Sequence, residues 1–127
     1  MRILFFCENT IDRPEYHLVT AVARKYAGVR AILGPDSPDA ERLRAEGVSV
    51  TPLRVRSRLD RRAVQTVRNL LTEGPADVVH CLGSHRQIST ALLASRGMSA
   101  KQVAYRGTLG HLNRLNPASR LSYLNSR

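Results

Sequence analysis

The sequence alternates between short, continuous apolar runs and longer segments whose apolar residues recur at helical spacing. The apolar runs cover residues 2–7, 29–33, 48–53, 77–81 and 102–105. Runs of this length, rich in valine, isoleucine and leucine, are typical of strands covered on both faces. The pattern therefore predicts five strands separated by helices.

The segments between these strands have the spacing of helices that pack on a sheet. In the first segment, Leu18, Val22 and Tyr26 recur at four-residue intervals with Ala21 on the same side, and Gly28 is expected to end the helix. Further helices are expected over residues 38–46, 60–71 and 86–96, with a short fifth helix from Pro117. The residues of the third and fourth helices expected to face the sheet are Val64, Val67, Leu71, Ile88, Leu92 and Leu93.

This order of elements favours a single α/β domain, a Rossmann-like parallel sheet of about five strands with helices on both faces. A chain of 127 residues has the usual size of one domain. Hydrophobic residues make up 43% and charged residues 24%, which excludes a disordered chain. Ligands of such sheets bind at the carboxyl ends of the strands, so the loops that follow the strands are the places to search.

The opening segment and the two cysteines indicate the cellular compartment of the protein. No apolar run approaches the ~20 residues that span a bilayer. The run that ends at Cys7 is too short for a signal peptide and is interpreted as a strand, so we expect a cytoplasmic location. Cys7 and Cys81 each end a predicted strand and lack Cys-x-x-Cys spacing, so we expect two buried residues without a disulfide.

The net charge of +10 comes from arginine, since Lys25 and Lys101 are the only lysines. Such a charge implies an anionic partner, namely nucleic acid, an anionic lipid surface or a phosphorylated substrate, although arginine usage can also reflect genome composition. The densest stretch contains Arg54, Arg56, Arg58, Arg61 and Arg62. It suits an anionic membrane surface or a phosphate-bearing ligand, and its alternative is a solvated basic loop. Because it holds no aromatic residue for base stacking, binding of single-stranded nucleic acid is disfavoured.

The loop after the first predicted strand is polar and contains no glycine. It therefore lacks the Gly-x-Gly-x-x-Gly pattern that lets a backbone approach a pyrophosphate, which argues against an NAD or FAD site. Glu15 and His17 at its end could hydrogen-bond a hydroxylated ligand. The alternative is an ordinary helix start, with Pro14 in the first turn and Glu15 favoured by the helix dipole.

Two histidines mark the region of the fourth predicted strand. His80 lies inside the strand and is interpreted as a core residue, whereas His85 follows a Gly-Ser turn at the edge where ligands bind. A histidine there could hold or orient a hydroxyl group. No third ligand has a suitable spacing, so no metal site is predicted.

The loop after the fifth predicted strand combines a cation with two glycines. Arg106 could bind a phosphate or carboxylate with two parallel hydrogen bonds, and Gly107 and Gly110 allow close approach of a ligand. The loop lacks the Gly-Lys-Ser/Thr of a P-loop. Its alternative interpretation is a flexible connection to the last helix.

Five stretches of the chain have the order and spacing of a known family. They are residues 2–7, 17–23, 47–53 with a Gly-Val-x-Val-x-x-Leu pattern, 75–81 with a Pro-Asp-Val-Val-His-like pattern, and 105–108 followed by 117–124. Together they resemble the N-terminal domain of family 4 glycosyltransferases, which have the GT-B architecture. The resemblance covers essentially the whole chain.

The resemblance implies transfer of a sugar from a nucleotide-sugar donor with retention of configuration. In this family the N-terminal domain faces the acceptor and the C-terminal domain binds most of the donor. The implied acceptor-binding residues are Glu15, Tyr16, His17, Ser84, His85, Arg106 and Gly107. His85 is the best catalytic candidate among them. Many members act on lipid or lipid-linked acceptors, which fits a peripheral position at the inner face of a membrane.

The chain departs from the family in two respects. Its first loop lacks the common Gly-Gly pair, and it ends at Arg127, before the further strand and the donor-binding domain of the family. Residues 1–127 are therefore expected to be an incomplete acceptor-side domain, inactive alone, with no cofactor of its own. A nucleotide-sugar donor is expected only with a second domain, in the same or a separate chain. The alternatives are a non-catalytic module that pairs with a donor-domain protein, and a basic nucleic-acid-binding protein.

Overall fold

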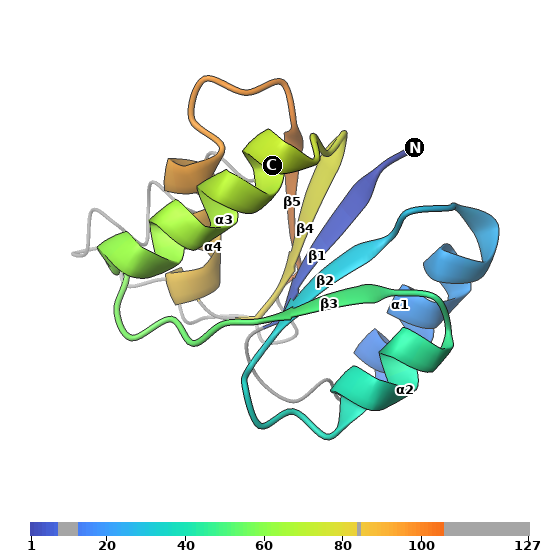
Figure 1. Ribbon diagram of the computed structural model, residues 1–127. Coiled ribbons are helices and arrows are strands. Elements are labelled where there is room, and N and C mark those ends of the chain that lie inside the picture. Colours follow the sequence, from blue (N-terminus) through green and yellow to red (C-terminus); the bar gives the residue numbers. More distant parts are fainter. Residues whose placement is uncertain (8–12, 84, 106–127) are drawn as a thin grey trace.

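The structure, a computed structural model, describes residues 1–7, 13–83 and 85–105 (Figure 1). Its elements are β1 (Ile3–Cys7), α1 (Arg13–Lys25), β2 (Arg30–Leu33), α2 (Asp39–Ala45), β3 (Ser49–Pro52), α3 (Arg61–Glu73), β4 (Val78–Leu82), α4 (His85–Ala94) and β5 (Lys101–Tyr105). The predicted alternation of strands and helices is confirmed over this range, with differences at the element ends. The helix expected from Pro117 lies outside the described residues.

All five strands are parallel and lie in the order β3-β2-β1-β4-β5. The predicted Rossmann-like α/β fold is therefore confirmed. Strands β1 to β3 progress toward one edge of the sheet, and the chain then crosses back through α3 to place β4 on the other side of β1. Because parallel crossovers are right-handed, α1 and α2 lie on one face and α3 and α4 on the other, as Figure 1 shows.

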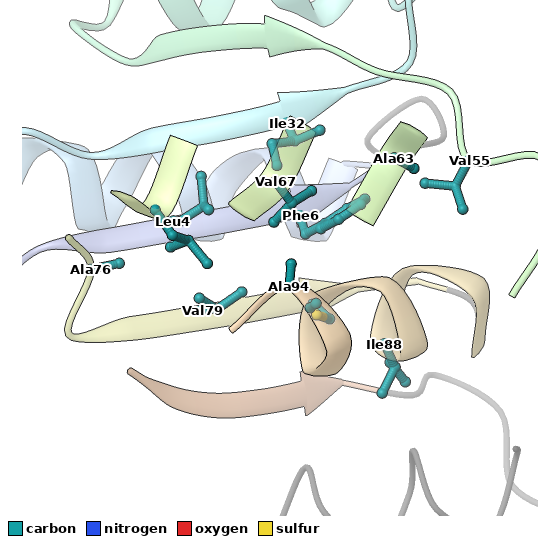
Figure 2. Close-up of a cluster of buried hydrophobic side chains, with 13 residues drawn as sticks. Leu4, Phe6, Ile32, Val55, Ala63, Val67, Ala76, Val79, Ile88 and Ala94 are labelled. Atoms are coloured by element: carbon teal, nitrogen blue, oxygen red, sulfur yellow. The ribbon is translucent and has the colours of Figure 1, made fainter. Parts of the chain in front are cut away.

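The central strand β1 is buried on both sides, which explains its unbroken apolar sequence. Leu4 and Phe6 face the side that carries α3 and α4, while Ile3, Phe5 and Cys7 face the side that carries α1 and α2. Figure 2 shows the first of these clusters, with Leu4 and Phe6 enclosed between the sheet and the two helices. The two clusters together form a core on each face of one sheet.

The buried face of α1 differs from the predicted one. Leu18 is 39% exposed and Ala21 is also exposed, whereas Val19 is fully buried against the sheet. Val22 is half-buried and packs on the same cluster. Leu18 and Val19 are adjacent apolar residues, so either of two faces of the helix could pack on the sheet. Only the position of the sheet determines which face is buried.

The buried face of α4 also departs from the prediction. Ile88 is buried as expected, but Leu93 is 38% exposed, and Ala91 and Ala94 pack on the sheet in its place. Thr90 is fully buried and donates its hydroxyl hydrogen to the carbonyl oxygen of Arg86 at 2.7 Å. Small residues on this face let α4 lie close to β4. A prediction based on the spacing of large apolar residues does not detect such a face.

Two arginines donate hydrogen bonds to backbone carbonyl groups at the carboxyl ends of helices. Arg30 on β2 donates to the carbonyl oxygens of Leu70, at 2.9 Å, and Gly74 at the end of α3. Arg68 on α3 donates to the carbonyl oxygens of Ala94 and Arg96 at the end of α4, both at 3.1 Å. A cation at these sites lies at the negative end of the helix dipole, and the carbonyl of Leu70 also accepts from the amide of Gly74 at 3.0 Å.

Candidate functional site at the switch point of the sheet

The carboxyl ends of β1 and β4 form the point at which the strand order reverses. The chain leaves β1 toward α1 on one face and leaves β4 toward α4 on the opposite face. In α/β sheets, ligands bind at the carboxyl ends of the strands near such a switch point. All four helices begin at this edge, so their positive dipole ends point toward it.

Glu15 places a carboxylate beside the end of β1. It lies in the first turn of α1, and its Oε2 is buried without a hydrogen-bond partner in the described part of the chain. Burial raises the pKa of Cys7, the last residue of β1, and the charges of Cys81 and then Glu15 raise it further, so the Glu15 carboxylate acts electrostatically on the end of that strand. A buried carboxylate oxygen without a donor is a costly feature, and a ligand hydroxyl would remove the cost.

The two predicted neighbours of Glu15 point elsewhere because successive helical residues diverge around the axis. Tyr16 is half-buried in the core under α2, where the guanidinium of Arg42 stacks 4.1 Å from its ring centroid. His17 is exposed, with its ring centroid 5.8 Å from that of Tyr16. Of the three residues, only Glu15 is placed beside the end of β1.

Helix α4, which follows β4, contributes a polar residue that the sequence patterns did not predict. Gln87, in the first turns of α4, is completely buried, and neither its Oε1 nor its Nε2 has a partner among the described residues. A Cβ atom on Gly83 would clash with that Oε1, so the carboxamide packs directly on the glycine. The available signal was the spacing of Gln87, Ala91 and Ala94, which places a polar residue on the apolar stripe of α4.

His85 is the first residue of α4 and is half-buried at the same edge. The structure therefore places it where the sequence predicted, next to the turn that ends β4. The remaining predicted acceptor-binding residues, Ser84, Arg106 and Gly107, lie outside the described residues. His80 is a half-buried strand residue as predicted, with its ring stacked on Phe5 at a centroid distance of 5.4 Å.

The predicted anionic-surface residues occupy the connection after β3 and the first two residues of α3, a segment that we call the basic loop (residues 54–62). Arg54 pairs with Asp36 at 3.3 Å, and both side chains are exposed. Asp60 caps α3 by accepting from the amide of Ala63 at 3.2 Å and holds the loop by accepting from the amide of Arg56 at 3.0 Å. These backbone hydrogen bonds, with that of Arg56 foremost, lower the pKa of Asp60.

Within residues 1–7, 13–83 and 85–105, no group of three histidine, cysteine, aspartate or glutamate side chains could hold a metal ion. No helix in the same part of the chain is both long and apolar enough to cross a bilayer. Both cysteines are free and buried, and they lie on opposite faces of the sheet.

Comparisons with known proteins give structural neighbours only. No family model matches the sequence, and no curated protein matches it significantly. The C-terminal domain of the PF1911 hydrogenase from Pyrococcus furiosus superposes with a TM-score of 0.63 and 17% sequence identity, covering 82% of this chain and 90% of that domain. The calicheamicin glycosyltransferase CalG4 superposes with a TM-score of 0.58 and 19% identity, covering 100% of this chain and 36% of its own length.

At these identities the two neighbours show the fold and nothing finer. The chain resembles a glycosyltransferase and a hydrogenase domain alike, so membership of family 4 is not established by the comparison. The whole chain corresponds to about a third of the length of CalG4.

Proposed function

We propose that this chain is the acceptor-side half of a retaining glycosyltransferase that uses a nucleotide-sugar donor. The observation that carries the proposal is the presence of buried polar atoms without partners at the switch point, on Glu15 and Gln87. The similarity of the entire chain to one portion of CalG4 supports it. The family 4 resemblance of the sequence supports it as well.

The roles of the residues follow from their chemistry. The Glu15 carboxylate accepts a hydrogen bond from an acceptor hydroxyl, and charge makes such a bond strong. The Gln87 carboxamide can both donate and accept, as a polyhydroxylated ligand does. His85, at the start of α4, is the candidate to orient or deprotonate the reacting hydroxyl.

A single domain of this kind is expected to bind an acceptor without transferring sugar to it. Transfer requires groups preorganised around the developing charge of the donor, and in a two-domain enzyme the second domain supplies them. The donor is therefore expected to bind in the presence of a second domain, in the same or a separate chain.

Ligand binding by the purified chain tests this proposal. A panel of methyl and octyl glycosides is screened by saturation-transfer NMR, and Glu15→Gln is compared with Glu73→Gln, which alters an exposed carboxylate in the last turn of α3. We expect Glu15→Gln to weaken glycoside binding roughly tenfold or more, as loss of a charged hydrogen bond does, and Glu73→Gln to leave it unchanged.

Two results would count against the proposal. If no glycoside of the panel binds up to its solubility limit, the chain is not an acceptor-binding domain of this class. If the purified chain transfers sugar from a nucleotide sugar at a substantial rate, it is a complete enzyme and the division into two halves is wrong.

A further inference from the structure

Three arginines of the basic loop differ from most other arginines in the described chain because they form no ion pair there, although Arg54 at the start of the loop does. Arg30 and Arg68 bind helix ends, and several others form ion pairs with carboxylates, namely Arg2, Arg24, Arg42 and Arg44. In contrast, Arg58, Arg61 and Arg62 make no ion pair with any residue that the structure describes. Three arginines without an ion pair among the described residues thus lie close together in the chain, between positions 58 and 62.

The same loop holds the most exposed large apolar side chain among the described residues. Leu59 is 72% exposed and stands between Arg58 and the capping residue Asp60. A single exposed leucine is ordinary, but one with Arg58 directly before it and Arg61 and Arg62 two and three residues after it forms an amphipathic tip.

The loop is held in a defined shape. Val55 is buried in the core beneath α3, as Figure 2 shows near the start of that helix, and Asp60 ties the backbone of Arg56 to the first turn of α3. Anchors on both sides of the tip mean that Leu59 is presented to solvent without a large ordering cost on binding.

We propose that the basic loop docks this protein on an anionic phospholipid membrane, with Arg58, Arg61 and Arg62 at the lipid phosphates and Leu59 inserted among the acyl chains. Basic residues near an anionic bilayer and a buried apolar side chain are the two contributions that attach peripheral proteins. The net charge of +10 adds a long-range attraction to the same surface. This inference is independent of any sugar-binding role.

Charge alone would suit nucleic acid equally well, but the apolar tip favours a membrane. Phosphate-tracking loops on single strands use aromatic side chains for stacking, and the basic loop has none. A leucine at the tip gains nothing from a phosphate backbone, whereas it is removed from water on entering a bilayer.

The placement of the loop also fixes an orientation. It follows the carboxyl end of β3 and leads into the first residue of α3, so it lies at the same edge of the sheet as Glu15 and His85. A membrane bound by this loop faces the carboxyl edge, and the amino edge, with Lys25 and Lys101, points away from it.

The absence of tryptophan from the chain provides a direct probe of insertion. In a Leu59→Trp variant the sole indole reports its own surroundings. We expect its emission to shift to shorter wavelength with phosphatidylglycerol/phosphatidylcholine vesicles, and brominated lipids to quench it. A Leu93→Trp variant, which probes the exposed leucine of α4, should show neither change.

Two triple variants separate local charge from total charge. The loop variant carries Arg58→Gln, Arg61→Gln and Arg62→Gln, and the control carries Lys25→Gln, Arg96→Gln and Lys101→Gln, three exposed cations outside the loop. Each arginine near an anionic surface contributes roughly fivefold, so the loop variant should lose on the order of 100-fold in vesicle partitioning. The control should lose far less, and circular dichroism verifies that both fold.

The opposite results would overturn the proposal. Unchanged Leu59→Trp emission with anionic vesicles would exclude insertion of the loop. Equal loss of vesicle partitioning in the two triple variants would show that the binding depends on the total charge of the protein and not on the basic loop. Loop-dependent binding to duplex DNA without binding to vesicles would assign the loop to nucleic acid.

Discussion

The two thiols illustrate how burial determines the chemistry of residues next to a candidate site. Burial raises the pKa of Cys81 to about 12, and burial, followed by the charges of Cys81 and Glu15, raises the pKa of Cys7 well above its usual range. A thiol that stays protonated is a poor nucleophile. Neither cysteine is therefore equipped for nucleophilic catalysis, although Cys7 ends β1 at the switch point.

We predict that neither thiol of the native protein reacts with Ellman's reagent at neutral pH, and that both react when urea unfolds the chain. A Ser99→Cys variant, altered at an exposed residue before β5, serves as the positive control and should react rapidly. Rapid native-state labelling of the unaltered protein would show that the carboxyl edge opens far more than the structure indicates.

His80 gives the protein a pH dependence with a definite sign. Burial lowers the pKa of this histidine below its usual value, so the unfolded chain binds the proton at a higher pH than the folded protein does. The unfolded state therefore gains protons first on acidification, and stability falls as pH decreases from about 7.5 to about 5.5.

Urea unfolding at the two pH values measures this effect. We predict that His80→Asn reduces the loss of stability between them. The carboxylates with lowered pKa values, Asp60 and Asp77, respond only below about pH 4, so they do not obscure this window. An equal loss in the variant would show that another group controls the dependence.

Helix ends account for part of the arginine excess. Arg30 and Arg68 each cap the last turn of a helix from a neighbouring element, and burial lowers the pKa of the Arg30 guanidinium without removing its charge. These residues stabilise the packing of α3 and α4 on the sheet. Composition alone, which assigned the positive charge to an anionic partner, could not separate them from the arginines of the basic loop.

We predict that Arg30→Met, which keeps the apolar stem and removes both donors, lowers the free energy of unfolding by about 2 kcal/mol. The matched control is Arg24→Met, whose guanidinium pairs with Glu46 at 3.1 Å on the surface. It should cost far less than Arg30→Met, because solvent screens an exposed ion pair. Denaturant unfolding of both variants checks this, and equal losses would contradict the capping role of Arg30.

The helices show where sequence patterns were sufficient and where they were not. The core face of α3 was predicted correctly at Val67 and Leu71, because large apolar residues recur there without competition. On α1 the adjacent Leu18 and Val19 gave two possible stripes, and only the docked sheet distinguishes them. On α4 the buried polar residue Gln87 broke the expected pattern.

The arrangement of the whole sheet followed from the alternation of elements, but the strand order did not. In that order, β3-β2-β1-β4-β5, strands β1 and β4 are adjacent. The first turns of α1 and α4, which follow these strands, therefore lie at the same edge of the sheet. The sequence supplied Glu15 and His85 as candidates from their positions after strands. It could not supply Gln87, whose significance depends on burial and on the lack of partners for its carboxamide.

The proposed acceptor site lies at the switch point of the sheet. Backbone amide shift mapping by NMR of the ¹⁵N-labelled chain, titrated with the glycoside that binds best, locates the bound ligand. We predict that the perturbed amides cluster at the carboxyl edge, around Glu15, Gly83 and His85. Perturbations confined to the amino edge, around Gly74 and Asp77, would contradict it.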